Sequence, residues 1–392
     1  MSKSKSSGMK GRIDVAVATI LFDLVLIAAI PSSSSSKSKS YGGLPVSVWC
    51  MTEYDSGSAP AVYDSLECSQ WKSLQNQISN NCQFAILHGR RQYQEDAIVC
   101  HLHFNIPLPG KNGFEEQKIG VVAVFDGHGG SEASEMASNL LLDYLYLHVV
   151  FQSYKKIVQH HDDDVSSSSD HQFSALQLEI LKEALSRTIA DIDLRFSQEA
   201  VRNNYVSGST AVVALIYDGK ILVANVGDSK ALLFSEKYQS GSSTVHLSAT
   251  ALTYDHHPDR EDERARIEAA GGSVTIWGVP RVNGVLAMSR AIGDVYLKRY
   301  GVIAEPEYTG WRLLDVNDAH LVVASDGIFE SLAEEDICDL ISEWKGSRNS
   351  SVCLSSTSLA ECIINTAYRK GSNDNLSAII VPLRSAEILS KT

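Results

Sequence analysis

Residues 211–226 read AVVALIYDGKILVANV, and this stretch decides the fold class. Two runs of mostly apolar and β-branched residues are joined by the dipeptide Asp218-Gly219. That dipeptide is typical of a two-residue turn between antiparallel strands. The stretch therefore predicts a β-hairpin, in which Asp218 is a turn residue without a chemical role.

From about residue 82 onward, short apolar strands and turn dipeptides alternate with a few segments of helical period. The helical segments are 131–150, 174–201, 259–270, 334–343 and 358–369. In the second segment, the apolar residues that share one helix face are Leu178, Leu181, Leu185, Ile189, Ile192 and Phe196. Such a stripe indicates a helix that packs on a core. The pattern predicts an α+β protein.

The chain of 392 residues has a formal charge of −13, and this charge is unevenly distributed. Residues 1–40 contain six Lys or Arg and two Asp, a charge of +4, so the rest of the chain carries −17. A body this acidic repels the phosphate backbone of DNA and RNA. We therefore expect no nucleic-acid partner.

Residues 15–30 form a largely apolar run behind four basic residues. A run of this length is near the lower limit for a membrane-spanning helix and is long for the core of a signal peptide. Asp23 in its middle adds about 2.5–3.5 kcal/mol to the cost of insertion. The sequence leaves three readings open for this run: a single membrane anchor, a cleaved signal peptide, or a transit peptide or disordered tail.

The location of the protein depends on that run. An inserted run makes the protein membrane-associated or secretory, and the basic residues before it would place the body on the non-cytoplasmic side. A run that does not insert leaves the protein in the cytoplasm. A Ser-rich linker at 31–40 completes this N-terminal segment, an extension follows at 41–81, and one large domain spans 82–385.

The seven cysteines show neither a CxxC pair nor the Cys/His spacing of a zinc site. Reduced thiols are one reading of them. Cys50, Cys68 and Cys82 lie close together after the apolar run, so a disulfide among them is the other reading.

Acidic residues recur where apolar strands begin or end. Asp126 and Asp326 each follow an apolar run and precede a glycine, and Asp374 lies just before the run 376–381. Carboxylates that converge at strand ends repel one another unless a cation neutralises them. An all-oxygen set without cysteine favours Mg²⁺ or Mn²⁺.

The segment 89–96, GRRQYQED, combines two more acids, Glu95 and Asp96, with two arginines. Arginine binds phosphate oxygens through a planar group whose charge persists at any working pH. Cations and arginine together indicate phosphate chemistry.

At this point the motifs resemble a known family, the type 2C protein phosphatases, and plant members in particular. The matching motifs, in the family's order, are GRRQYQED (89–96), VFDGHGG (124–130), SGSTAV (207–212), VANVGDS (223–229), TYDHHP (253–258), ERARIEAAGG (263–272), GVLAMSRAIGD (284–294), ASDGIFE (324–330) and SNDNLSAIIV (372–381). The resemblance covers about residues 82 to 383.

The resemblance implies a fold and a metal centre. The fold is a sandwich of two antiparallel β-sheets flanked by helices, in four layers of helix, sheet, sheet and helix. The centre holds two ions of Mg²⁺ or Mn²⁺. Matched position by position, the implied metal positions are Asp126, Gly127 through its carbonyl, Asp326, Asp374, Glu95, Asp96 and Asp294, of which Asp96 and Asp294 act through water or an additional ion.

The resemblance also implies the reaction, which is hydrolysis of phosphoserine or phosphothreonine in proteins. Two cations activate a water that attacks phosphorus in line. Arg91 holds the phosphate oxygens, and His128 gives a proton to the leaving alkoxide. The expected partner is a phosphoprotein substrate, and the protein is expected to be a monomer.

The chain departs from the family in two places. Gln94 stands where many relatives have Met, a position that is not a ligand. Asn204 and Tyr205 lie where some relatives have an Asp that helps to hold a third metal, so a third ion stays an open question. The alternatives to a phosphatase are a catalytically idle scaffold of the same fold and a phosphodiesterase, which the ordered motifs disfavour.

Overall fold

The computed structural model describes residues 82–111, 113–160, 170–238, 245–346, 353 and 355–384. The predictions for residues 1–40, for the extension at 41–81 and for Cys50 and Cys68 lie outside the described residues. Within these ranges, no helix is both long enough and apolar enough to cross a bilayer.

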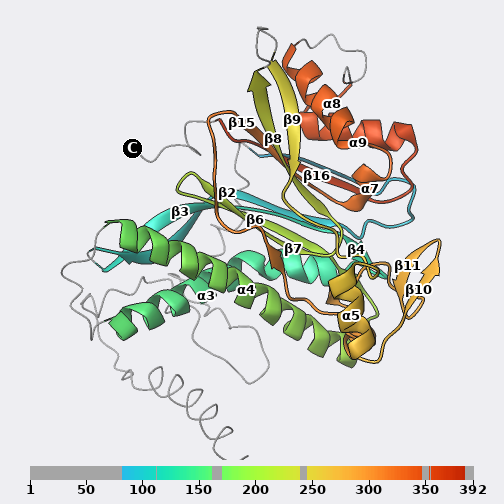
Figure 1. Ribbon diagram of the computed structural model, residues 1–392, viewed down its shortest axis with the longest axis horizontal. Helices are drawn as coiled ribbons and strands as arrows, with labels where there is room; N and C mark the ends of the chain where they lie inside the picture. Colours follow the sequence, from blue (N-terminus) through green and yellow to red (C-terminus); the bar gives the residue numbers. More distant parts are fainter. Residues whose placement is uncertain are drawn as a thin grey trace, which may run out of the picture. The chain divides into compact units, whose positions relative to one another are not determined.

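A six-stranded antiparallel sheet has the strand order β13-β7-β6-β3-β2, with β14 also beside β7. Figure 1 labels β2, β3, β6 and β7 of this sheet. Its strands are β2 (Ala97–Gly110), β3 (Gly113–Phe125), β6 (Ala211–Tyr217), β7 (Lys220–Val226), β13 (Glu307–Tyr308) and β14 (Arg312–Leu313). The whole of β6 is buried. Its run is apolar throughout because both faces of the sheet are covered.

The second antiparallel sheet has five strands in the order β1-β16-β15-β8-β9. They are β1 (Gln83–Leu87), β8 (Lys230–Tyr238), β9 (Val245–Ala251), β15 (Asp318–Ala324) and β16 (Leu376–Pro382). The strand that comes last in the chain, β16, thus lies between the first strand and β15.

The two sheets pack face to face. One apolar cluster joins Val122 and Val212 of the first sheet to Leu233, Val323 and Ile379 of the second. Helices cover the outer faces, and the order helix, sheet, sheet, helix confirms the predicted α+β sandwich. The helices are α3 (Glu132–His160), α4 (Asp170–Asn203), α5 (Glu261–Ala269), α6 (Val295–Lys298), α7 (Asp326–Phe329), α8 (Glu334–Gly346) and α9 (Leu359–Lys370).

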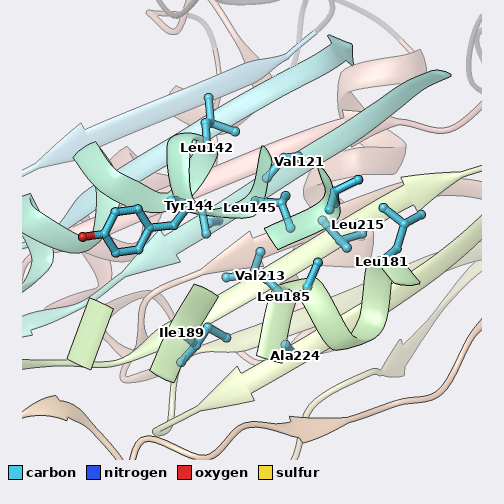
Figure 2. Close-up of a cluster of buried hydrophobic side chains, with 14 of the residues drawn as sticks. Val121, Leu142, Tyr144, Leu145, Leu181, Leu185, Ile189, Val213, Leu215 and Ala224 are labelled. Carbon is cyan, nitrogen blue, oxygen red and sulfur yellow. The ribbon is translucent and has the colours of Figure 1, made fainter. Parts of the chain in front are cut away.

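The stripe predicted on 174–201 is the inner face of α4. Leu181, Leu185 and Ile189 are buried against Val213 and Leu215 of the first sheet, as Figure 2 shows. On the other side of the sandwich, α7, α8 and α9 pack on the second sheet. The short helices α6 and α7 were not predicted, since four residues are too few to show a helical period.

The hairpin predicted at 211–226 is present. Tyr217 of β6 pairs with Lys220 of β7, and only Asp218 and Gly219 lie between them. Their φ angles are +52° and +66°, the left-handed conformation that such a turn requires at both positions.

A small three-stranded sheet lies at one end of the sandwich. It contains β4 (Gly127–His128), β5 (Gly208–Ser209) and β12 (Ile292–Gly293) in the order β12-β5-β4. Segments that are far apart in the chain thereby meet directly beside Asp126 and Asp294. A separate hairpin, β10 (Val274–Trp277) with β11 (Val279–Val282), follows α5.

Disulfides join four of the described cysteines, Cys82 to Cys100 and Cys353 to Cys362. The reading of reduced thiols is therefore wrong for these four. Cys82, the residue before β1, bonds Cys100 of β2, and both pack in the apolar cluster between the two sheets. Cys338 is a free cysteine.

Candidate metal centre and active site

The acidic residues singled out in the sequence come from both sheets. Asp126 follows β3 and Asp96 precedes its partner β2, while Asp326 follows β15 and Asp374 precedes its partner β16. The two sheets meet at this end, where the backbone N–H of Asp326 donates to Oδ2 of Asp126 at 3.4 Å. The fold therefore gathers carboxylates that are 278 positions apart, from 96 to 374.

These carboxylates are held in surroundings that oppose their charge. Burial raises the pKa of Asp126 well above its usual range, and the neighbouring charges of Asp96 and Asp326 raise it further. Burial, with the charges of Asp228 and Asp374, raises the pKa of Asp326 to about 7. Repulsion of this kind is relieved by protons or by a bound cation.

Asp96 is also buried, and burial raises its pKa to about 6, although the nearby hydroxyls of Ser377 and Ser325 oppose this shift. Neither carboxylate oxygen of Asp96 makes a hydrogen bond of good geometry with the described residues. Buried carboxylate oxygens without a hydrogen-bond partner are able to accept a hydrogen bond from a metal-bound water. The oxygen atoms of these carboxylates are therefore suitable ligands for hard divalent cations.

Gly127 is a glycine because the segment that carries Glu95 passes directly over it. A Cβ at this position would overlap the backbone carbonyl oxygen of Glu95. The side chain of Glu95 is held in turn, since its Oε1 accepts a 2.8 Å hydrogen bond from the N–H of Gly130. Glu95 and the backbone of Gly127 are therefore neighbours, as the resemblance implies for two metal positions.

The two adjacent arginines have different environments. Arg90 stacks on the ring of Tyr368 at 4.3 Å and donates to the carbonyls of Tyr368 and Ser372. The side chain of Arg91 is 56% exposed, and its Nη2 contacts Oδ2 of Asp374 at 2.5 Å. Of the two, Arg91 is placed to meet a phosphate at the carboxylate cluster.

His128 lies one residue beyond Gly127 and bonds an acid from the far side of the small sheet. Its Nε2 is 2.7 Å from Oδ2 of Asp294, which is almost fully buried. Burial lowers the pKa of His128, but the hydrogen bond and charge of Asp294, together with the charges of Asp228 and Glu95, outweigh this effect and raise it. Asp294, predicted as an outer metal position, thus touches the predicted proton donor.

Asp228 is an acid of this site to which the sequence analysis gave no role. It lies in the turn between β7 and β8, is buried, and its Oδ1 has no hydrogen-bond partner within the described ranges. Its charge raises the pKa of both Asp126 and Asp326. The motif VANVGDS contained the signal, but an acid after a strand is usually a turn residue.

An open hollow adjoins Asp228, lined in part by Lys230, Asp255 and His257. Asp255 accepts from Lys230 at 3.1 Å and from His257 at 3.4 Å. The hydrogen bond to Asp255 raises the pKa of His257, against the smaller opposing effect of burial. The hollow therefore carries both signs of charge next to the carboxylate cluster.

Asn204 and Tyr205 lie at the position where a third ion was left open. The backbone of Asn204 is left-handed, with a φ of +58°. The ring of Tyr205 stacks on Phe196 with centroids 6.4 Å apart. An aromatic ring thus lies where some relatives are expected to have a carboxylate.

No three acidic, histidine or cysteine side chains of the described part are already arranged to hold a metal ion. Asp374 instead pairs with Arg91. The cluster has the burial, charge and donor chemistry of a cation site.

Comparison with known proteins places the chain in a family. A family profile described as Protein phosphatase 2C matches residues 80–376. "Probable protein phosphatase 2C 51" of Arabidopsis thaliana is 42% identical over 86% of this chain and 78% of its own. "Protein phosphatase 2C 77", also of Arabidopsis thaliana, is 35% identical over 76% of this chain and 69% of its own.

Solved structures agree with the fold. A serine-threonine phosphatase 2C from Toxoplasma gondii superimposes with a TM-score of 0.61 at 21% identity, covering 77% of this chain and 94% of that one. A C.elegans sex determining protein superimposes with a TM-score of 0.58 at 28% identity, covering 79% of this chain and 67% of that one. The chain belongs to the protein phosphatase 2C family and is a metal-dependent serine/threonine protein phosphatase.

Proposed function

We propose that two ions of Mg²⁺ or Mn²⁺ occupy the carboxylate cluster and that Asp126, the carbonyl of Gly127, Asp326, Asp374 and Glu95 hold them. The observation that carries this proposal is the convergence of buried acids with raised pKa values from both sheets. Such a pair of cations supplies a water of lowered pKa as nucleophile and positive charge that offsets the charge of the phosphate.

Arg91 binds the phosphate group of the substrate in this proposal. Its guanidinium group now lies on Asp374, and its exposed side chain is free to swing toward solvent. A phosphate offers this group two oxygens in a planar arrangement, and Asp374, once released by Arg91, would be open to a cation. Substrate and cation therefore favour the same movement of Arg91.

His128 supplies the proton for the leaving group. A serine or threonine alkoxide is strongly basic and leaves slowly unless it is protonated. Asp294 holds Nε2 of His128 at 2.7 Å and thereby fixes the orientation of the ring. The raised pKa keeps the ring protonated to a higher pH than an isolated histidine.

In this proposal the other acids, Asp96, Asp228 and Asp294, do not bind a cation directly. Asp96 and Asp228 are buried beside Asp126 and carry oxygens able to accept hydrogen bonds from metal-bound water. Asp294 holds His128 directly, so its role here is to orient the proton donor, and a further ion is not needed for that role.

The test is phosphate release from a phosphothreonine peptide by residues 41–392 with Mn²⁺ or Mg²⁺, beside Asp126→Asn and Asp326→Asn. Activity that needs metal and is lost in both variants supports the proposal. Absence of turnover in the folded, metal-loaded wild type would favour the idle scaffold. A preference for a phosphodiester over the phosphopeptide would instead indicate the phosphodiesterase.

We also propose that residues 15–30 attach the protein to a membrane, on the strength of their apolar character and the basic residues before them. Fractionation of cells that express the full chain or residues 41–392 tests this. Loss of membrane association on deletion supports the proposal, and equal solubility of both forms would overturn it. Glycan attachment at Asn349 would report which side of the membrane the catalytic domain faces.

A further inference from the structure

Asn375 lies next to a proposed metal ligand, and the mechanism above does not use it. It is 4% exposed, and its side chain faces the segment His88–Asp96, here called the arginine loop because it carries Arg91. The same loop carries Glu95 and Asp96 and connects β1 of one sheet to β2 of the other.

The amide of Asn375 makes three hydrogen bonds to this loop. Its Nδ2 donates to the carbonyls of His88 and Tyr93, both at 2.9 Å. Its Oδ1 accepts from the backbone N–H of Glu95 at 2.7 Å. Both donor positions are used and the acceptor faces an N–H, so the amide has one orientation that satisfies every partner.

No other side chain of similar size reproduces this set. Aspartate offers no donor to the two carbonyls, leucine offers neither donor nor acceptor, and glutamine is longer by one carbon. Each of the three hydrogen bonds stabilises the present path of the loop, and the carbonyl of His88 also accepts from the N–H of Arg91 at 3.2 Å.

The backbone around Asn375 is as closely packed as its side chain. A Cβ on Gly89 of the arginine loop would overlap the carbonyl oxygen of Asp374, and a Cβ on Gly327 would overlap that of Asn375. The N–H of Asn375 also donates to Oδ1 of Asp374 at 2.7 Å. One residue thus contacts the segments that carry Glu95, Asp374 and Asp326.

We propose that Asn375 is a positioning residue that holds Arg91 and Glu95 in register with Asp326 and Asp374. It touches neither the phosphate nor a cation and acts through the path of the arginine loop. Loss of its amide frees both ends of the loop around Arg91, so that phosphate binding and cation binding weaken together. The inference rests on the proposed function.

The experiment compares Asn375→Ala with Asn373→Ala in the full chain. Asn373 is an exposed asparagine in the same turn, and no role in the site falls to its side chain. For Asn375→Ala we expect the KM for a phosphothreonine peptide to rise about tenfold or more, since loss of such outer partners typically costs 10–100-fold. We expect a similar loss of Mn²⁺ affinity by isothermal titration calorimetry, which does not depend on turnover.

A double mutant tests whether Asn375 acts through Arg91. If it does, Asn375→Ala raises KM far less in an Arg91→Ala background than in the wild type. Additive effects in the two backgrounds would overturn the inference. So would a variant with a lower melting temperature whose KM and Mn²⁺ affinity match those of Asn373→Ala.

Should Asn375→Ala fail to fold, Asn375→Ser provides the second variant, because its hydroxyl still bonds one partner. It is expected to show the same two losses to a smaller degree, and unchanged KM and Mn²⁺ affinity would overturn the inference. A wild type without turnover would refute the proposed function, whereas an active wild type with a normal Asn375→Ala variant would refute only this inference.

Discussion

Neighbouring residues of the same type have different roles at this site. Arg90 and Arg91 are equivalent in the sequence, but Arg90 packs on Tyr368 while Arg91 reaches Asp374. Asp218 and Asp228 both follow apolar strands, yet one is a turn residue and the other is buried beside the cluster. Local sequence does not separate these cases, because burial depends on the packing of distant segments.

His128 permits a prediction at this scale. His128→Asn is expected to lower kcat on a phosphothreonine peptide by about 10²–10⁴-fold, because the alkoxide then leaves without a proton. On p-nitrophenyl phosphate the loss is expected to be much smaller, since nitrophenolate is a stable anion. Steady-state kinetics on both substrates check this. Equal losses on the two substrates would show that His128 has another role.

Helices and strands with a clear periodicity of apolar residues were predicted from the sequence. Very short elements that form through contacts between distant segments were not. The second helical segment, predicted at 174–201, is α4 at Asp170–Asn203, and the hairpin turn lies at the predicted dipeptide. The two-residue strands of the small sheet have no period to detect. For that reason the contact between His128 and Asp294 could not be predicted from spacing.

The hairpin of β6 and β7 permits a prediction at the scale of elements. Asp218→Ala is expected to lower the free energy of unfolding by about 1 kcal/mol, because alanine is strained at a φ of +52°. Asp218→Asn is the control, as asparagine tolerates that conformation. Urea denaturation measures the difference, with kcat unchanged in both variants. A loss of kcat in either would show that Asp218 has a chemical role after all.

Over the whole molecule, the family resemblance and the apolar pattern together were enough to predict the four-layer sandwich. The acids at its end other than Asp228 could be named from the motifs, but their electrostatic state could not, because it arises from burial between two sheets. The disulfide between Cys82 and Cys100 was missed for the same reason, since it joins the residue before β1 of one sheet to β2 of the other.

The buried acids make stability depend on pH when metal is absent. The pKa values of Asp96 and Asp326 rise from 3.8 to about 6 and about 7, so the folded protein binds more protons than the unfolded chain between about pH 4 and 7. Their contribution to stability is full below that range and is lost as pH rises through it. Asp126, whose pKa is also raised, adds to the effect.

Thermal unfolding in EDTA should be measured for the wild type and for Asp126→Asn at each pH. The melting temperature of the wild type minus that of the variant should fall from pH 5 to pH 8. Added Mn²⁺ should flatten this dependence, because a cation replaces the protons. A metal-free wild type whose melting temperature rises across this range relative to the variant would contradict the assigned pKa shifts.

The place of β16 in the second sheet bears on how the protein is made. Asp374 and Asn375 precede this strand, which inserts between β1 and β15. A ribosome has therefore synthesised nearly all of the described chain before the last proposed ligand emerges. A nascent or prematurely terminated chain lacks Asp374, so a metal site that uses this residue as proposed would form only when synthesis of the domain is complete.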